Sequence, residues 1–135
     1  MALITWSNNY SVNIKEIDAQ HQKLVELVNL LHDHMKAGKG KDAVGKILKE
    51  LADYTVYHFS TEEKLFAKYY YPDSRPHIRE HQDLVEQVTK LILDYDKGSG
   101  VLPMDLMDFL RDWLINHIAK SDKKFTAFFN SKGIN

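Results

Sequence analysis

Hydrophobic residues along this chain recur every three or four positions, which is the spacing of one face of an α-helix. The period-two alternation that would indicate strands is missing. Segments with glycine and proline at 37–42, 71–76 and 97–103 interrupt the helical pattern. The chain is therefore predicted to be all-α, with helices over about residues 18–37, 42–69, 74–96 and 103–129.

Short connections between long helices favour antiparallel neighbours, which predicts an up-down-up-down four-helix bundle. Residues 1–16 precede the first helix and are expected to form an N-terminal arm, with Trp6 packed on the bundle. The predicted N-caps are Asp18, Asp42 and Ser74, and Pro103 fits the first turn of the fourth helix.

The composition narrows the class of protein. With 135 residues, the chain is expected to bury one core as a single domain, 1–135. Its 18 basic and 19 acidic residues give no field that would attract nucleic acid or an anionic membrane. It has no cysteine, no segment resembling a signal peptide and no stretch as long and apolar as a membrane span, so a cytoplasmic protein is expected.

Several polar residues fall within the apolar stripes of the predicted helices. They are His21, His58, Glu62, His77, His81 and His117, and each helix contributes at least one. Burying a carboxylate with several imidazoles is costly unless something pairs with them. A metal ion is an economical partner because it binds neutral imidazole and carboxylate together. The stripes therefore predict a metal site in the core.

The spacing of these residues supports a shared site. His58 and Glu62 are four positions apart, as are His77 and His81, so each pair shares one helix face. His117 and Asp122 are five apart, which a regular α-helix separates by about 140°. Either Asp122 reaches around the helix, or a π-bulge realigns the two residues.

Three other polar residues are assigned to solvent or to structure. His32 and His34 lie near the predicted end of the first helix, where a cation is favoured, and both are expected to be structural. Glu63 projects about 100° away from Glu62 and is expected to be a solvated surface acid.

The string HIREH at 77–81 also matches the H-x-x-E-H signature of a class of zinc peptidases. In such a site, the glutamate beside the histidines acts as the general base of one zinc ion. Here Glu80 lies off the apolar stripe, and five histidines are too many for one zinc. A dinuclear centre is the better interpretation.

Two six-coordinate metals offer about twelve positions, of which five histidines, two bridging carboxylates and one shared oxygen bridge fill about eleven. The position left open suits a small diatomic ligand.

The order of these residues resembles hemerythrin, the non-haem di-iron oxygen-binding family. The strings IDAQHQKL, HFSTEE, HIREH and HIAKSD are similar to its bacterial branch, the bacteriohemerythrins. The resemblance implies one iron held by His77, His81 and His117 and a second iron, with the open position, held by His21 and His58. It also implies that Glu62 and Asp122 bridge the two irons (Fe2+/Fe3+) together with an oxo or hydroxo group. Asn13 stands where the family often has glycine, and asparagine tolerates similar backbone angles.

The implied function is reversible binding of O2, without catalysis, for oxygen transport, storage or delivery, and the expected partner is an oxygen-consuming client protein. A dry pocket over the open position is expected from Leu24, Phe59, Leu114, Ile118 and Trp113, which could equally be ordinary core. Two alternatives remain: an oxygen- or redox-sensing module, and a di-iron oxidoreductase acting on peroxide or nitric oxide. The chain is expected to be a monomer.

Overall fold

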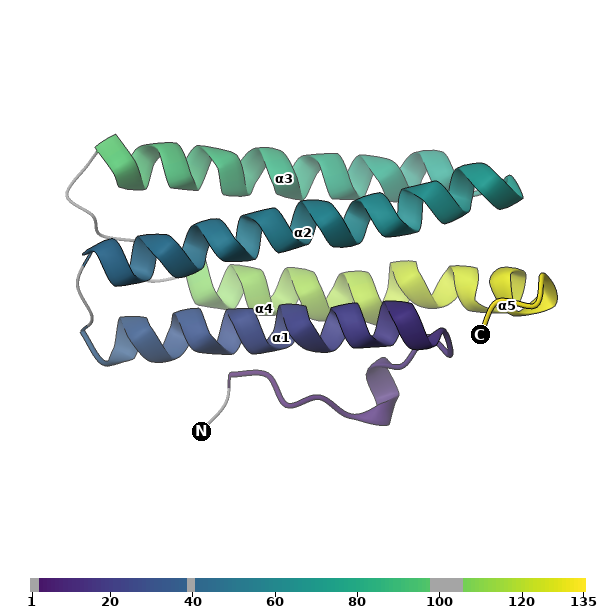
Figure 1. Cartoon of the computed structure of the whole chain (residues 1–135), viewed down its shortest axis with the longest axis horizontal. Helices are drawn as coiled ribbons and strands as arrows, with labels where there is room; N and C mark the ends of the chain where they lie inside the picture. Colours follow the sequence, from purple (N-terminus) through teal and green to yellow (C-terminus); the bar gives the residue numbers. More distant parts are fainter. Residues whose placement is uncertain (1–2, 39–40, 98–105) are drawn as a thin grey trace.

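The computed structural model describes residues 3–38, 41–97 and 106–135. The described elements are the 3-10 turn η1 (Asn8–Tyr10), α1 (Lys15–Lys36), α2 (Lys41–Tyr69), α3 (Ser74–Lys97), α4 (Leu106–Asn116), the π-helical segment η2 (His117–Asp122) and α5 (Lys123–Ser131). Successive helices run in opposite directions, and α4, η2 and α5 together form the fourth rod (Figure 1). The predicted all-α, up-down-up-down four-helix bundle is confirmed.

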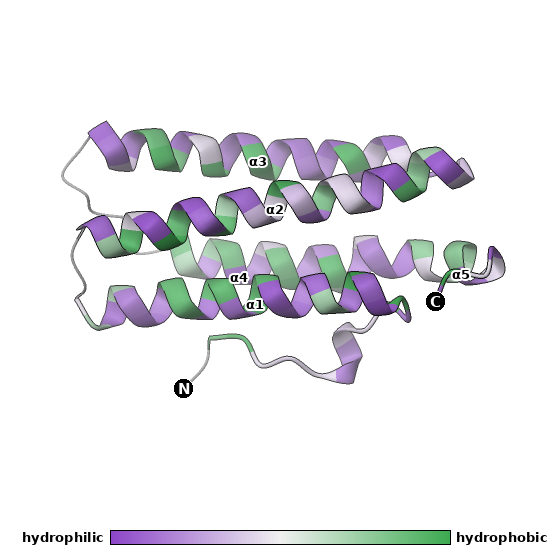
Figure 2. Cartoon of the chain, viewed as in Figure 1, coloured by the Kyte–Doolittle hydropathy of each residue, from purple (hydrophilic) through white to green (hydrophobic). Residues whose placement is uncertain are grey.

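Each helix buries one stripe and exposes the rest. Figure 2 shows hydrophobic and hydrophilic residues interspersed along every helix, as expected for rods that surround a common interior. The buried apolar side chains form two clusters. The larger contains Leu31, Leu48 and Leu110, and the smaller, which is rich in aromatic rings, contains Phe66, Phe125 and Phe129. Among the described residues, no helix is long and apolar enough to cross a membrane.

The N-terminal arm lies beside α1 (Figure 1). Its buried residues are aliphatic: Ile4, Val12 and Ile14 are each at most 4% exposed, whereas Trp6 is only half-buried against the larger cluster. The backbone N–H of Ile4 donates to the side-chain oxygen of Asn29 (2.9 Å), and the Asn29 amide donates back to the Ile4 carbonyl (2.8 Å). The arm is thus held mainly by burial of its aliphatic side chains and by hydrogen bonds. The predicted contact of Trp6 with the bundle is present, but it buries that side chain less.

The prediction that Asp18 is an N-cap is wrong. The helix α1 already begins at Lys15, and its N-cap is Ile14. Asp18 instead accepts hydrogen bonds from Ser11 Oγ (2.6 Å) and from the backbone N–H of Val12 (2.8 Å), so it ties the arm to the first turn. Asp42 and Ser74 likewise lie within the first turn of their helices rather than before them. The predicted role of Pro103 falls outside the described residues.

Candidate metal centre

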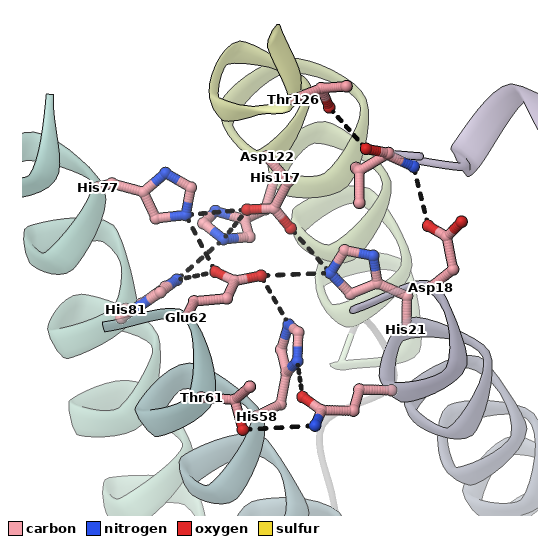
Figure 3. A network of polar contacts seen from close by, with 12 residues as sticks. Asp18, His21, His58, Thr61, Glu62, His77, His81, His117, Asp122 and Thr126 are labelled. Carbon is pink, nitrogen blue, oxygen red and sulfur yellow. Dashed lines mark hydrogen bonds and ion pairs between the residues drawn. The ribbon is translucent and has the colours of Figure 1, made fainter. Parts of the chain in front are cut away.

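Seven polar side chains meet between the two hydrophobic clusters, and all are at most 4% exposed. Their ligand-type atoms form two groups, within each of which the atoms lie no more than 4.8 Å apart. The larger group contains Glu62, His77, His81, His117 and Asp122, and the smaller contains His21, His58, Glu62 and Asp122. The two carboxylates belong to both groups. The structure thus brings together all seven residues predicted as ligands (Figure 3).

Helical periodicity positions the members from α2 and α3. His58 and Glu62 are one turn apart on α2, with His58 Nε2 3.0 Å from Glu62 Oε2. On α3, the Nε2 atoms of His77 and His81 both approach Glu62 Oε1, at 3.2 and 3.1 Å. Glu62 therefore lies between the two groups, with one oxygen directed to each (Figure 3).

In the fourth rod, a π-helical segment brings His117 and Asp122, which are five positions apart, onto the same face. This segment, η2, runs from His117 to Asp122, and both residues are buried. The wider π turn places residues five apart on the same face. As a result, His117 Nε2 lies 3.0 Å from Asp122 Oδ1, and the other oxygen of Asp122 lies 2.8 Å from His21 Nε2. The π-bulge alternative of the prediction is confirmed.

Several of the converging atoms lie 2.8 to 3.5 Å from one another, yet their contacts lack the angles of good hydrogen bonds among the described residues. They are His21 Nε2, His58 Nε2, Glu62 Oε2 and both carboxylate oxygens of Asp122, which interact mainly through charge. In addition, the Nε2 atoms of His81 and His117 lie only 3.1 Å apart. Buried polar atoms are rarely left unsatisfied in this way. Nitrogen and oxygen donors that converge on one another without good hydrogen-bond geometry are suited to cations placed between them, so the residues present fit a metal pair.

The pKa values of these residues in the metal-free chain also favour a cation site. Burial alone would lower the pKa of His21, but hydrogen bonds and charge interactions with Asp122 and Glu62 outweigh it and raise that pKa to about 9. The same balance raises the pKa of His77 to about 9, and the pKa of His117 is also raised. Burial opposes ionisation of Glu62 and Asp122, yet the surrounding histidines hold the pKa of both carboxyls well below its usual range. The carboxylates are therefore anionic, and they attract positive charge, whether protons or metal ions.

The outward ring nitrogens of three histidines have acceptors that the sequence analysis missed. His58 Nδ1 donates to Gln20 Oε1 (2.7 Å), and His81 Nδ1 donates to Glu63 Oε2 (2.9 Å). His117 Nδ1 lies 3.4 Å from Glu80 Oε1, a long hydrogen bond. The prediction that Glu63 is merely a solvated acid is therefore wrong. Such partners fix the tautomer and orientation of a metal-binding imidazole. Each missed residue is adjacent to a predicted ligand in sequence, which was the available signal.

The remaining predicted assignments can be placed as well. His34 Nδ1 donates to the Leu30 carbonyl (3.0 Å), and neither His34 nor His32 belongs to either group of ligand-type residues. Glu80 accepts from Ser121 Oγ at 2.7 and 2.9 Å and faces the outer side of His117. Glu80 thus lies outside the cluster. A zinc peptidase would need its general base inside the cluster, so the structure agrees with the rejection of a peptidase site.

A cavity of about 30 Å³ adjoins the cluster. All five residues of the predicted pocket line it: Leu24, Phe59, Trp113, Leu114 and Ile118. The lining also includes Val28, Leu51, Thr55, Leu84, Val88 and Leu110, which the prediction did not name. The hydroxyl of Thr55 is occupied by a hydrogen bond to the Leu51 carbonyl (2.7 Å). The cavity is therefore small and almost wholly apolar, apart from the histidines at one end.

Those histidines are His21, His58 and His117, whereas His77 and His81 do not line the cavity. Phe59 forms part of the wall and stacks on His81, with ring centroids 3.8 Å apart and an angle of 4° between the planes. Trp113 stacks on His117 with ring centroids 4.5 Å apart. The cavity thus reaches both histidines of the smaller group but only His117 of the larger group, where aromatic rings stack on His81 and His117.

The fold and this cluster define a four-helix bundle that binds cations through buried histidine and carboxylate side chains. The hemerythrin HHE cation binding domain matches residues 12–129. A bacteriohemerythrin of Methylococcus capsulatus is 38% identical over 93% of this chain and 95% of its own length. A bacteriohemerythrin of Pseudomonas paraeruginosa is 36% identical over 90% of this chain and 78% of its own, and a hemerythrin-like protein of Naegleria gruberi is 33% identical over 89% and 88%.

The crystal structure of a wild-type hemerythrin superposes with a TM-score of 0.87, at 38% identity, over 93% of this chain and 97% of that one. The chain therefore belongs to the hemerythrin family. It carries the buried metal site of histidine, glutamate and aspartate that the sequence resemblance led us to expect.

Proposed function

We propose that this chain binds O2 reversibly at a non-haem di-iron centre and serves in oxygen transport, storage or delivery. The observation that carries the proposal is the unequal division of ligands around one cavity. The larger group has three histidines and the smaller has two, while both share Glu62 and Asp122. The apolar cavity contacts both histidines of the smaller group, where a six-coordinate metal would have a free position, and only His117 of the larger group.

In this proposal, His77, His81 and His117 hold one iron, and His21 and His58 hold the other. Glu62 and Asp122, which belong to both groups, would be shared by the two irons, and an oxo or hydroxo group would complete the centre. The irons would cycle between Fe2+ and Fe3+ and so supply the electrons for reversible binding of O2. The protein itself orients the imidazoles and keeps water away from the open position.

The apolar cavity also favours a carrier over an enzyme. A di-iron oxidoreductase that reduces peroxide or nitric oxide needs a positioned proton donor near the substrate. The hydroxyl of Thr55 lines the cavity, but it already donates its proton to a backbone carbonyl. A binding role without catalysis, in which an oxygen-consuming client protein draws on the bound O2, is therefore the function that we infer.

The test starts with metal analysis of the purified protein, for which two irons per chain are expected. Under anaerobic reduction followed by air, an absorbance band should appear, vanish under vacuum and return over many cycles. Steady consumption of peroxide or nitric oxide in the presence of a reductant, without a reversible band, would overturn the carrier role in favour of the oxidoreductase. A single metal ion per chain in every preparation would overturn the dinuclear centre.

A further inference from the structure

The two groups of ligand-type residues differ in what supports their histidines from outside. In the three-histidine group, His81 Nδ1 donates to the Glu63 carboxylate (2.9 Å), and His117 Nδ1 lies 3.4 Å from the Glu80 carboxylate. In the two-histidine group, His58 Nδ1 donates to the neutral amide of Gln20 (2.7 Å). His21 Nδ1 is buried and has no hydrogen-bond partner among the described residues. Charged acceptors thus support one group only.

This difference bears directly on metal affinity. An imidazole that donates its outer N–H to a carboxylate becomes a stronger donor to a metal and is held in the binding orientation. A neutral amide orients the ring but adds no charge. A metal on Nε2 of His21 would fix the ring proton on Nδ1, where no acceptor among the described residues receives it, so this ring lacks the support that strengthens a metal-binding imidazole.

The acceptors are themselves held in place. Glu80 accepts two contacts from Ser121 Oγ, at 2.7 and 2.9 Å, and Ser121 lies in the π-helical segment. The amide nitrogen of Gln20 donates to Thr61 Oγ1 (3.3 Å), which turns the amide oxygen toward His58. The side chains of Glu63 and Glu80 are 36% and 44% exposed, so solvent screens their charges in part. Glu63, with the shorter hydrogen bond, is expected to contribute more than Glu80.

The shared carboxylates separate the two binding steps in affinity. Glu62 and Asp122 belong to both groups, so the first cation to bind neutralises part of the charge that would attract the second. The second cation also has one histidine fewer. Unequal support and unequal ligand number favour the same group, and the shared anions make binding of the second cation weaker than binding of the first.

We propose that the two metal positions fill in a fixed order. The three-histidine position, supported by Glu63 and Glu80, binds its ion first and releases it last. The two-histidine position, supported only by Gln20, binds second and releases first. A chain with one ion at His77, His81 and His117 is then a stable state. This inference rests on the dinuclear centre of the proposed function, and it implies that loss of the second ion alone would abolish oxygen binding.

The experiment begins with the iron-loaded protein under anaerobic, reducing conditions and removes iron with increasing concentrations of a chelator. Iron per chain should fall in two steps, with a plateau at one. A crystal grown at the plateau should show iron, by anomalous scattering, beside His81 and none beside His58. Gln20→Ala should shift the first step to about 10- to 100-fold lower chelator concentration and leave the second unchanged. Glu63→Ala should shift the second step by a similar factor, and Glu63→Gln should restore part of the loss.

Glu86→Gln is the matched control, because Glu86 lines the same surface hollow as Glu63 and His81, while no histidine is within hydrogen-bonding distance of it among the described residues. It should leave both steps unchanged.

Release of both irons in one step from the unmodified protein would overturn ordered filling. Equal weakening of both metal positions by Gln20→Ala would overturn it as well. Two ordered steps without a reversible oxygen band would support ordered filling and overturn only the oxygen role. A protein that never holds more than one ion would overturn both.

Discussion

Metal binding to this chain should release protons, and the structure sets the number. In the metal-free chain the pKa of both His21 and His77 is raised to about 9 by the anionic Glu62 and Asp122. At pH 7 a group with that pKa is about 99% protonated, whereas an ordinary histidine of pKa 6.5 is about 24% protonated. Because a metal requires the neutral imidazole, these two rings should release about two protons together, against about 0.5 for unperturbed rings.

The raised pKa of His117 can only add to this number. Glu62 and Asp122 release nothing, since their lowered pKa values leave them ionised at pH 7. The overall affinity for the pair of ions should therefore rise about 100-fold per pH unit above pH 7, about tenfold for each ion, and level off near pH 9, the sign expected when protons compete with the metal. In acid, protonation of the same groups should expel the metal.

Calorimetric titration with Zn2+, a redox-inert substitute for Fe2+, provides the measurement. Repeating it at pH 7 in buffers of different ionisation enthalpy yields the number of protons released per chain. His34→Gln serves as a control because His34 lies outside the cluster, and it should not change the count. Release of fewer than about one proton would refute the reasoning, because it would mean that the carboxylates do not hold protons on His21 and His77.

Three further substitutions test the pocket, the core and the arm. Leu114→Asn puts a polar group into the dry cavity and should shorten the lifetime of the oxygenated form severalfold, whereas Leu114→Ile should preserve it; an unchanged lifetime in the asparagine variant would count against the pocket. Phe66→Ala removes a ring that is 2% exposed and packs against Phe125 and Phe129, so urea unfolding should show a loss of about 3–5 kcal/mol, and a loss below about 1 kcal/mol would contradict the assigned packing. Asn13 has φ 54°, so Asn13→Ala should cost about 1 kcal/mol in the same assay while Asn13→Gly should be nearly neutral, and equal effects would show that the left-handed backbone is not the cause.

The metal-free chain should also respond to pH in its own stability. A raised histidine pKa contributes stability that is full below about pH 6.5 and is lost as the pH rises through about 9. The lowered pKa values of Glu62 and Asp122 contribute stability that is present above about pH 4 and is lost in acid. Maximum stability of the metal-free chain is therefore expected between about pH 4.5 and 6.5, below the pH at which metal binds best.

Helical periodicity was enough to predict the bundle and the convergence of the ligand-type residues. His58 with Glu62, and His77 with His81, share a face by spacing alone, and a buried stripe has only one interior to face. The pair His117 and Asp122 shows where the method stops. A spacing of five allowed either a π turn or a side chain that reaches around, and only the backbone distinguishes the two.

The errors concern contacts between helices. Glu63 was assigned to solvent because it lies about 100° from Glu62, but its long side chain reaches His81 on α3. How far a side chain extends toward a neighbouring rod depends on the distance and offset between rods, which no single-helix pattern contains. Asp18 was misplaced for a related reason, since its real partners, Ser11 and Val12, lie in the irregular arm, which has no periodicity to read.

The π-helical segment has a consequence beyond the alignment of two ligands. It accommodates one more residue than a regular turn would, so the direction in which every later side chain of the rod points depends on that extra residue. If the same residues formed a regular α-helix instead, the rest of the rod would rotate by about 100° relative to the residues before the segment. Phe125 and Phe129, now at most 1% exposed, would then turn away from the aromatic cluster. The extra residue thus determines which side chains of the C-terminal end face the core. A regular α-helix of the same length would lose the aromatic packing.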